Sequence, residues 1–359
     1  MTQHTAPVSV SVSVPEVDRP DGTAHPARVG PLLRAARAVA VLACLPYVGL
    51  KVSWIAGGEL GIPPGSSLLD HRATMAVANG LTVLMDAAVV VLALLLTRPW
   101  GLRVRAWLLV LPVWVATGLL APIMAGFPLQ LLVRAFGGSV ATSGEGARQF
   151  LDPWVFGVVY GGFILQGLAL GVLFVAYARR RWGHLWQGTV RDLPAHAPTG
   201  PARRVAATAT AALALVPVTL HALWGSGATA GLNASTVAER TSDGYALEWM
   251  HTGFAAATAA GVLMLAFRRG GALAVKVPLA LAWVGSGALA CWGGWLSLAA
   301  LTGVDDLADQ PSALLHLTYA VQMIVGMLVL TIGAHFFAER ASEHASEHAA
   351  ERAAVRRAG

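Results

Sequence analysis

Apolar residues in this chain gather in eight long blocks separated by short polar connections. The blocks cover 36–57, 74–96, 105–125, 154–178, 205–225, 246–267, 274–300 and 313–337. As a helix, each is about long enough to cross a ~30 Å hydrocarbon core at ~1.5 Å of rise per residue. The blocks are too long and too uniformly apolar for the strands of a membrane barrel. The pattern predicts an all-α integral membrane protein with eight transmembrane helices.

Composition supports a membrane location. Of the 359 residues, 12% are charged and 56% are hydrophobic, whereas a soluble domain carries about 25% charged residues. A soluble enzyme, a DNA-binding protein and a disulfide scaffold are therefore disfavoured. The expected partner is the lipid bilayer. The two cysteines lie inside apolar blocks and predict no disulfide framework.

The charges in the polar connections alternate between the two sides of the predicted membrane. One side has Arg72, Arg134, Arg148 and Arg240 among acids such as Glu59 and Asp70. The other side receives Arg28, Arg34, Arg37, Arg98, Arg103, Arg105, Arg179, Arg180, Arg181, Arg191, Arg203, Arg204, Arg268, Arg269, Lys276, Arg340, Arg352, Arg356 and Arg357. The positive-inside rule then predicts a multi-pass protein of the bacterial plasma membrane with both termini cytoplasmic. The net charge of +6 reflects this orientation, and no nucleic-acid partner is expected.

Five regions follow from this topology. We expect a disordered cytoplasmic tail over 1–33, a four-helix repeat over 34–182, a cytoplasmic linker over 183–204, a second four-helix repeat over 205–338 and a charged helical tail over 339–359. In that last tail, His344 and His348 have a spacing that suits a metal ion. A solvated helical extension is the favoured interpretation.

The two halves of the chain resemble each other. The first span ends on Lys51-x-x-Trp54-x-x-Gly57-x-x-x-Gly61, and the fifth ends on His221-x-x-Trp224-x-x-Gly227-x-x-x-Gly231. Further matches join Trp114 and Gly118 to Trp283 and Gly287, and Tyr160 and Gly167 to Tyr319 and Gly326. Four spans per repeat give both halves the same orientation, with an axis along the membrane normal. The sequence therefore predicts two tandem four-helix bundles packed through small residues such as Gly167 and Gly171.

The connection 126–153 is the longest on the outer side. Its segment 128–136 is expected to lie in the membrane interface as a short amphipathic helix.

Polar side chains inside the spans are the first candidates for function, because each costs a few kcal/mol to insert. Most lie in the outer half of the predicted membrane, and we expect them to line an outward-facing polar cavity: Lys51, Trp54, Asp86, Trp224, Glu248 and Tyr319. Asp86 needs a partner, for which Lys51 on the neighbouring helix is suited. Two simpler interpretations stay open. Lys51 could extend to the outer headgroups beside an anchoring Trp54, and the repeated Trp and Gly pattern could be only a helix terminus.

Three histidines favour a different chemistry. His221, His251 and His316 are predicted to lie at similar depth in the second bundle. Imidazoles on facing helices of a four-helix bundle can hold an iron porphyrin from both sides. His251 and His316 would be the two ligands of a b-type haem, with His221 as the alternate ligand. Packing histidines are the other interpretation.

The chain resembles haem A synthase in three features: eight spans in two bundles, the motif Glu248-Trp-Met-His251, and His316 at the start of the last span. At the positions of the first half that match His251 and His316, this chain has Leu81 and Gly157, which are not ligands. The resemblance therefore implies at most one haem b, in the second bundle. The His-x-x-Trp-x-x-Gly pattern and the Ala- and Arg-rich composition are also similar to uncharacterised polytopic membrane proteins of actinobacteria, from which no activity follows.

Motifs for other chemistry are absent from the sequence. It has no phosphate-binding loop, no nucleophile elbow, no Cys-x-x-Cys and no paired Asp-rich prenyl-transfer motif. No catalytic residue and no metal site are predicted, and a non-enzymatic role is favoured. Three hypotheses remain: a carrier for a small molecule or ion, or a membrane accessory protein, with a polar cavity; a haem-binding redox protein; and a purely structural membrane protein.

Overall fold

The computed structural model describes residues 30–139, 151–194, 199–301 and 310–358, and this part of the chain contains helices and turns with one isolated bridge between Thr189 and Ala274. The long helices are α1 (Pro31–Leu42), α2 (Leu45–Ile55), α3 (Arg72–Thr97), α4 (Ala106–Ala135), α5 (Pro153–Trp182), α6 (Gly200–Gly225), α8 (Ser242–Phe267), α9 (Lys276–Ala300) and α10 (Ala313–Ala358). A short helix, α7 (Ala234–Ala238), precedes α8. Short 3-10 turns lie at Ser67–Leu69, Pro99–Arg103, Gly183–Trp186 and Val190–Asp192. Most of the predicted N-terminal tail lies outside the described residues.

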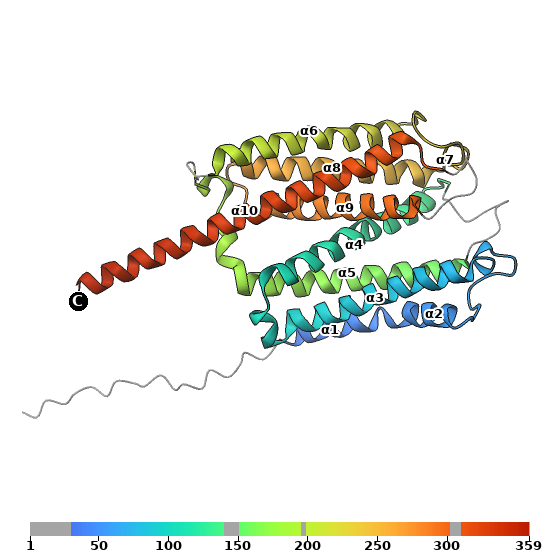
Figure 1. Ribbon diagram of the computed structural model, residues 1–359, viewed down its shortest axis with the longest axis horizontal. Helices are drawn as coiled ribbons and strands as arrows, with labels where there is room; N and C mark the ends of the chain where they lie inside the picture. Colours follow the sequence, from blue (N-terminus) through green and yellow to red (C-terminus); the bar gives the residue numbers. More distant parts are fainter. Residues whose placement is uncertain (1–29, 140–150, 195–198, 302–309, 359) are drawn as a thin grey trace, which may run out of the picture.

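Within the described residues, eight helices are long and apolar enough to cross a membrane, which confirms the eight predicted spans. They run side by side along one direction, and α10 projects beyond the others (Figure 1). The first span consists of α1 and α2 together. The helix is interrupted at Ala43 and Cys44 because Pro46 has no backbone N–H to donate to the preceding turn.

Two elements extend beyond their apolar blocks. The segment 128–136, predicted to be a separate interface helix, instead continues α4 as far as Ala135. Pro128 does not end the helix, which stops only before Gly137, a residue with a left-handed φ of 78°. At the other end of the molecule, α10 continues for 46 residues and carries the charged tail as the predicted helical extension.

The helices form two groups of neighbours. In the first group, α5 packs against α1, α2, α3 and α4, while α3 packs against α1 and α2. In the second group, α6 packs against α8 and α10, and α9 packs against the same two helices. The groups meet where α4, which lies between them in Figure 1, packs against α9 and α8.

The contact between α4 and α9 is close because both helices have a glycine there. A Cβ atom on Gly118 would overlap the backbone carbonyl of Gly287. On one side of this crossing, the Trp114 indole N–H donates to Ser286 Oγ at 3.1 Å. On the other side, the Trp283 indole N–H lies 3.4 Å from Thr117 Oγ1. Small residues thus bring two membrane helices into backbone contact, as is common in such proteins.

The two glycines named from the sequence have other surroundings. A Cβ on Gly167 would collide with Met124, so this glycine lets α5 approach α4 within the first group. A Cβ on Gly171 would meet no atom within 4 Å.

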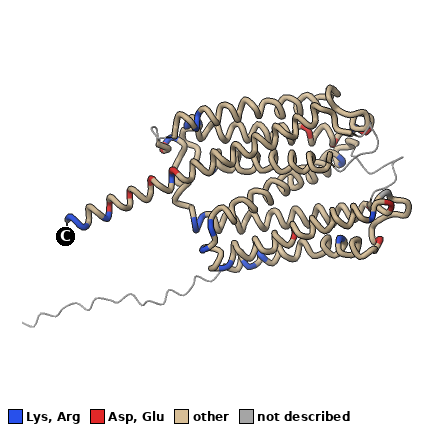
Figure 2. The backbone as a smooth tube through the Cα atoms, viewed as in Figure 1, with Lys and Arg blue, Asp and Glu red and all other residues tan. Residues whose placement is uncertain are grey.

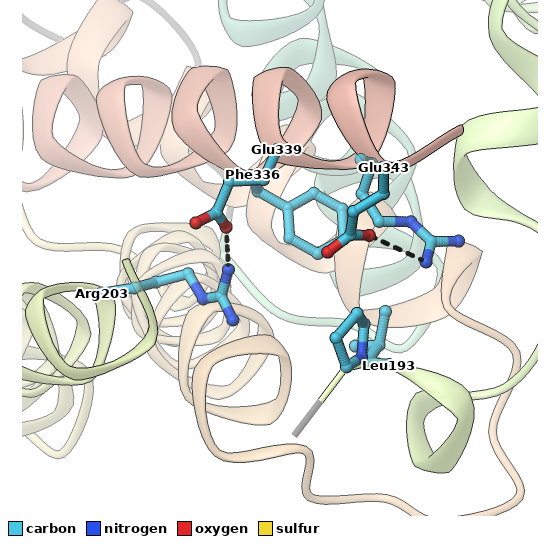
Figure 3. A pocket seen from close by; sticks show the side chains of 7 residues that line it. Leu193, Arg203, Phe336, Glu339 and Glu343 are labelled. Carbon is cyan, nitrogen blue, oxygen red and sulfur yellow. Dashed lines mark hydrogen bonds and ion pairs between the residues drawn. The ribbon is translucent and has the colours of Figure 1, made fainter. Parts of the chain in front are cut away.

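The first turn of α6 is tied to α10 at the end from which α10 projects, here called the α10 end. Arg203 Nη1 lies 2.6 Å from Glu339 Oε2, and its guanidinium lies 5.9 Å from the Phe336 ring centroid (Figure 3). A hollow of about 10 Å³ lies among these side chains. It holds at most one water molecule, so this region is a structural junction between the two helices.

Positive charges gather at the α10 end of the helices, whereas the opposite end, where α7 lies, carries few (Figure 2). The end of α7 is here called the α7 end.

The glycine contact gives a stability prediction. Gly118→Ala places a methyl group against the Gly287 backbone, so we expect the free energy of unfolding to fall by about 1–3 kcal/mol, the usual cost of overpacking. Gly171→Ala is the matched control, because its methyl group enters open space. Thermal unfolding of the detergent-purified protein, followed by circular dichroism, measures both. Equal melting temperatures for the two variants would contradict the contact.

Candidate functional site

A buried ion pair lies inside the first helix group. Lys51 Nζ of α2 is 3.0 Å from Asp86 Oδ2 of α3, and each side chain is 8% exposed. The predicted pairing of these two residues is therefore present. Tyr47 adds a hydrogen bond, since its hydroxyl lies 3.1 Å from Asp86 Oδ1. Both carboxylate oxygens of Asp86 thus have a partner, which a buried charge requires.

Aromatic rings surround the Lys51 ammonium group. Tyr47 and Lys51 are four residues apart on α2 and share one face of the helix. Lys51 Nζ lies 4.9 Å from the Tyr47 ring centroid and 5.6 Å from the ring centroid of Phe163 on α5. These distances are within the range of cation–π attraction. The ammonium therefore has one carboxylate and two ring faces around it.

Gln166 of α5 completes this cluster. Its side-chain Oε1 lies 3.1 Å from the Tyr47 hydroxyl, and its Nε2 is buried with no partner. The phenol has one proton, so it cannot donate to both Asp86 and Gln166. The opposite orientation of the amide resolves the conflict, because Gln166 then donates to Tyr47 while Tyr47 donates to Asp86. We call Tyr47, Lys51, Asp86, Phe163 and Gln166 the lysine cluster.

Apolar side chains close the lysine cluster at both ends. Towards the α7 end lie Leu50, Trp54, Ile62, Met75, Leu151 and Val155. Towards the α10 end lie Ala36, Ala40, Leu92, Ala93, Leu96, Leu109, Val113, Leu120, Ala169, Leu170, Leu173 and Tyr177. The Lys51 and Asp86 side chains therefore lie buried within the first helix group, and the outward-facing polar cavity stays a prediction.

The repeated Trp and Gly pattern forms the same helix terminus in both groups. After α2, Gly57 N–H donates to Trp54 O and Gly58 N–H donates to Ser53 O. After α6, Gly227 N–H donates to Trp224 O and Ala228 N–H donates to Leu223 O. This is the Schellman arrangement, in which the first glycine takes a left-handed φ, here 90° and 102°.

The indole groups of Trp54 and Trp224 close the turn that follows each terminus. Trp54 Nε1 donates to Leu60 O at 2.7 Å, and Trp224 Nε1 donates to Ala230 O at 3.0 Å. The helix-terminus interpretation of the motif is therefore confirmed for both tryptophans.

A second polar cluster lies in the other helix group, again one turn before the tryptophan. His221 Nδ1 of α6 is 2.5 Å from Glu248 Oε2 of α8, and His221 Nε2 is 2.8 Å from Gln322 Nε2 of α10. The His251 ring stacks on His221 with 5.2 Å between centroids. We call His221, Glu248, His251 and Gln322 the histidine cluster. It has a base, an acid and an amide on three helices, as the lysine cluster has.

The remaining predicted site residues have different surroundings. Trp224 meets the His221 ring edge-on at 5.3 Å between centroids. Tyr319 is half-buried on α10 and interacts electrostatically with Glu248. His316 is exposed on α10, and no contact brings it to His251 among the described residues.

The haem hypothesis stays a prediction. Both ring nitrogens of His221, the alternate ligand, are engaged in hydrogen bonds, and the His251 ring lies 5.2 Å from the His221 ring between centroids. The described arrangement therefore favours a hydrogen-bonded cluster over two facing ligands.

Sequence reasoning missed Phe163 and the uncharged polar members of both clusters, Tyr47, Gln166 and Gln322. A usable signal is present for each of the polar residues. Tyr47 is four residues from Lys51, and Gln166 and Gln322 are amides inside apolar spans. In a membrane such groups need internal partners as much as charges do.

A hollow of about 410 Å³ lies between the two helix groups. Its walls come from α3, α4, α5, α8 and α9, with side chains such as Leu96, Leu120, Met124, Phe174 and Phe254. None of the predicted polar-cavity residues lines it. The hollow is apolar, and it adjoins the α4–α9 crossing through Thr117 and Val284.

Comparisons of this chain with protein-family models, curated proteins and solved structures give no match. The described residues carry eight apolar helices compatible with a multi-pass membrane protein in a lipid bilayer.

The buried ion pair gives the second prediction. Asp86→Leu alone leaves Lys51 without its counter-charge, so we expect a loss of about 3–5 kcal/mol in the free energy of unfolding. Combining it with Lys51→Met removes both charges, and most of the stability should return. Denaturation of the detergent-purified variants measures the free energy of unfolding of each.

The matched control is the pair of Arg72 and Glu59, whose side chains are each 54% exposed. Glu59→Ala should cost less than about 1 kcal/mol. If the losses from Lys51→Met and Asp86→Leu simply added together in the double variant, the two residues would not be acting as a pair.

Proposed function

We propose that the protein is a multi-pass protein of the plasma membrane with both termini cytoplasmic. The α10 end would face the cytoplasm, since the positive charges gather there (Figure 2) and cytoplasmic connections carry the excess of Lys and Arg. On this assignment the α7 end, with both Schellman termini, faces outward.

We further propose that the chain consists of two related four-helix repeats, 34–182 and 205–338, joined by the linker 183–204 and flanked by the tails 1–33 and 339–359. Reciprocal contacts between α4 and α9 support this. The Trp114 indole donates a hydrogen bond to Ser286, and the Trp283 indole, which matches Trp114 in the other repeat, donates one to Thr117. Contacts of this kind are expected at a two-fold axis between related units. The two Schellman termini give further support.

The activity proposed for this protein is carriage of a small monovalent cation, with Asp86 as the cation-binding carboxylate. The observation that carries the proposal is the Lys51–Asp86 pair, 8% exposed on each side chain and located within membrane-crossing helices. An ionisable residue at such depth is a functional candidate by default because of its insertion cost. Lys51 would act as a tethered cation that occupies the site while no substrate is bound.

Exchange of the substrate for a proton follows from the charges. When a free cation pairs with Asp86, the Lys51 ammonium loses its counter-charge in an environment that stabilises charge poorly. Lys51 then releases one proton to solvent, and its neutral amine leaves the site to the cation. One cation bound and one proton released keep the net charge of the cluster constant. The apolar closures at both ends fit an occluded state of such a cycle.

The test is cation-driven proton movement in proteoliposomes that carry a pH-sensitive dye and an acidic interior. Na⁺, K⁺ and ethylammonium are added outside in turn as chlorides, and loss of internal protons is recorded. We expect at least one of the three to drive proton exit above that of empty liposomes. Asp86→Asn should abolish this signal, because the amide carries no charge to pair with the cation.

Glu59→Gln is the control variant for the exchange assay. It removes an acid whose side chain is 54% exposed, outside the lysine cluster, and should leave the exchange unchanged. Equal exchange in the wild type and Asp86→Asn would contradict the proposed site. Absence of exchange with all three cations would contradict the carrier proposal and favour a structural role for the pair.

A further inference from the structure

The surroundings of the Lys51 ammonium define which cation would replace it. Around that position lie one carboxylate, Asp86, and the ring faces of Tyr47 and Phe163 at 4.9 and 5.6 Å. The other oxygens of the cluster are the Tyr47 hydroxyl and one Gln166 amide oxygen. The hydroxyl already bonds Asp86, so it is only partly available to a ligand.

Hard metal cations prefer a shell of several oxygen ligands. The lysine cluster supplies few oxygens and replaces the rest of the shell by aromatic carbon. Ring faces attract ammonium groups and are the usual recognition surface for organic cations. An ammonium group also donates directional N–H bonds, as Lys51 Nζ does to Asp86 Oδ2 at 3.0 Å.

We propose that the lysine cluster is a binding site for primary alkylammonium ions, whose head group takes the place of the Lys51 ammonium between Asp86, Tyr47 and Phe163. This assignment rests on the proposed carrier function for its biological role and deepens it by naming the substrate class. A short alkyl chain would follow the path now taken by the Lys51 methylene groups. Quaternary ammonium ions lack the N–H bond to Asp86 and bind more weakly.

Binding is tested first, without any transport measurement. Lys51→Ala removes the tethered cation and leaves Asp86, Tyr47 and Phe163 in place. We expect ethylammonium chloride to raise the melting temperature of this variant in a saturable manner, as a ligand of the folded state does. NaCl and tetramethylammonium chloride at the same ionic strength should give a smaller shift.

The matched control is Lys51→Ala combined with Asp86→Asn, in which the same space is vacated but the carboxylate is absent. We expect no saturable stabilisation of this double variant by ethylammonium. Equal stabilisation of the single and double variants, or of the single variant by all three salts, would overturn the assignment. If Lys51→Ala does not fold, ethylammonium present during solubilisation of the membranes should raise the yield of folded protein, and an unchanged yield counts against the proposal.

The aromatic contribution is tested in the wild-type background. Phe163→Leu removes one ring face and should lower the preference for ethylammonium over Na⁺ in the exchange assay roughly two- to thirtyfold, the range expected for one cation–π contact. Phe127→Leu is the control, because Phe127 packs on Tyr160 at 5.2 Å between centroids. An unchanged preference in Phe163→Leu would overturn the role of the ring.

The two proposals fail in different ways. Exchange driven by Na⁺ or K⁺ in preference to ethylammonium would leave the carrier function standing and remove the alkylammonium assignment. Saturable binding of ethylammonium to Lys51→Ala with no exchange by the wild type would keep the site and remove the carrier function.

Discussion

A polar group inside a lipid bilayer has no water to bond with, so it must find its partner within the protein. This constraint governs both helix groups of the structure. Lys51 and Asp86 neutralise each other, and Tyr47 and Gln166 extend the pair into a hydrogen-bonded cluster. Because those partners lie on three different spans, the polar cluster also fixes how α2, α3 and α5 sit against one another. Apolar contacts alone would not hold these helices together as specifically, because lipid tails are as apolar as the side chains that pack between helices.

The lysine cluster and the histidine cluster have the same arrangement but different side chains. Each places a base one turn before the tryptophan that closes the helix terminus, and each pairs it with an acid from the next span. Lys51 pairs with Asp86, near the middle of α3, whereas His221 meets Glu248 within the first turns of α8. The Glu248 side chain is 26% exposed, against 8% for Asp86. The lysine cluster is therefore the more enclosed of the two, which is why the proposed cation site is located there.

The sequence predicted the spans and the helix termini because these depend on local features. Hydropathy predicts the eight membrane spans. Gly57 and Gly227 mark helix ends because glycine adopts the left-handed backbone conformation that these ends require. The lysine–aspartate pair was also predictable, since a lone carboxylate in a span requires a cation. The amides Gln166 and Gln322 stand out as polar residues in apolar spans, but the partner that each meets depends on helix rotation, which the sequence does not give. His316 shows the same limit: it lies near the start of its span as expected, yet it is exposed.

Movement between the groups would be required of a carrier, and the interface has properties that suit it. Gly118 and Gly287 let α4 and α9 touch through their backbones, and the indoles of Trp114, Trp283 and Trp292 form hydrogen bonds between the two helices. Beside this crossing lies the apolar hollow of about 410 Å³, which is lined by residues of both helix groups. Pro112, Pro122 and Pro128 remove backbone hydrogen bonds along α4. The helix that makes the main contacts between the two groups thus lacks several of its own backbone hydrogen bonds, and rotation about the glycine crossing would change the packing around the lysine cluster through α5.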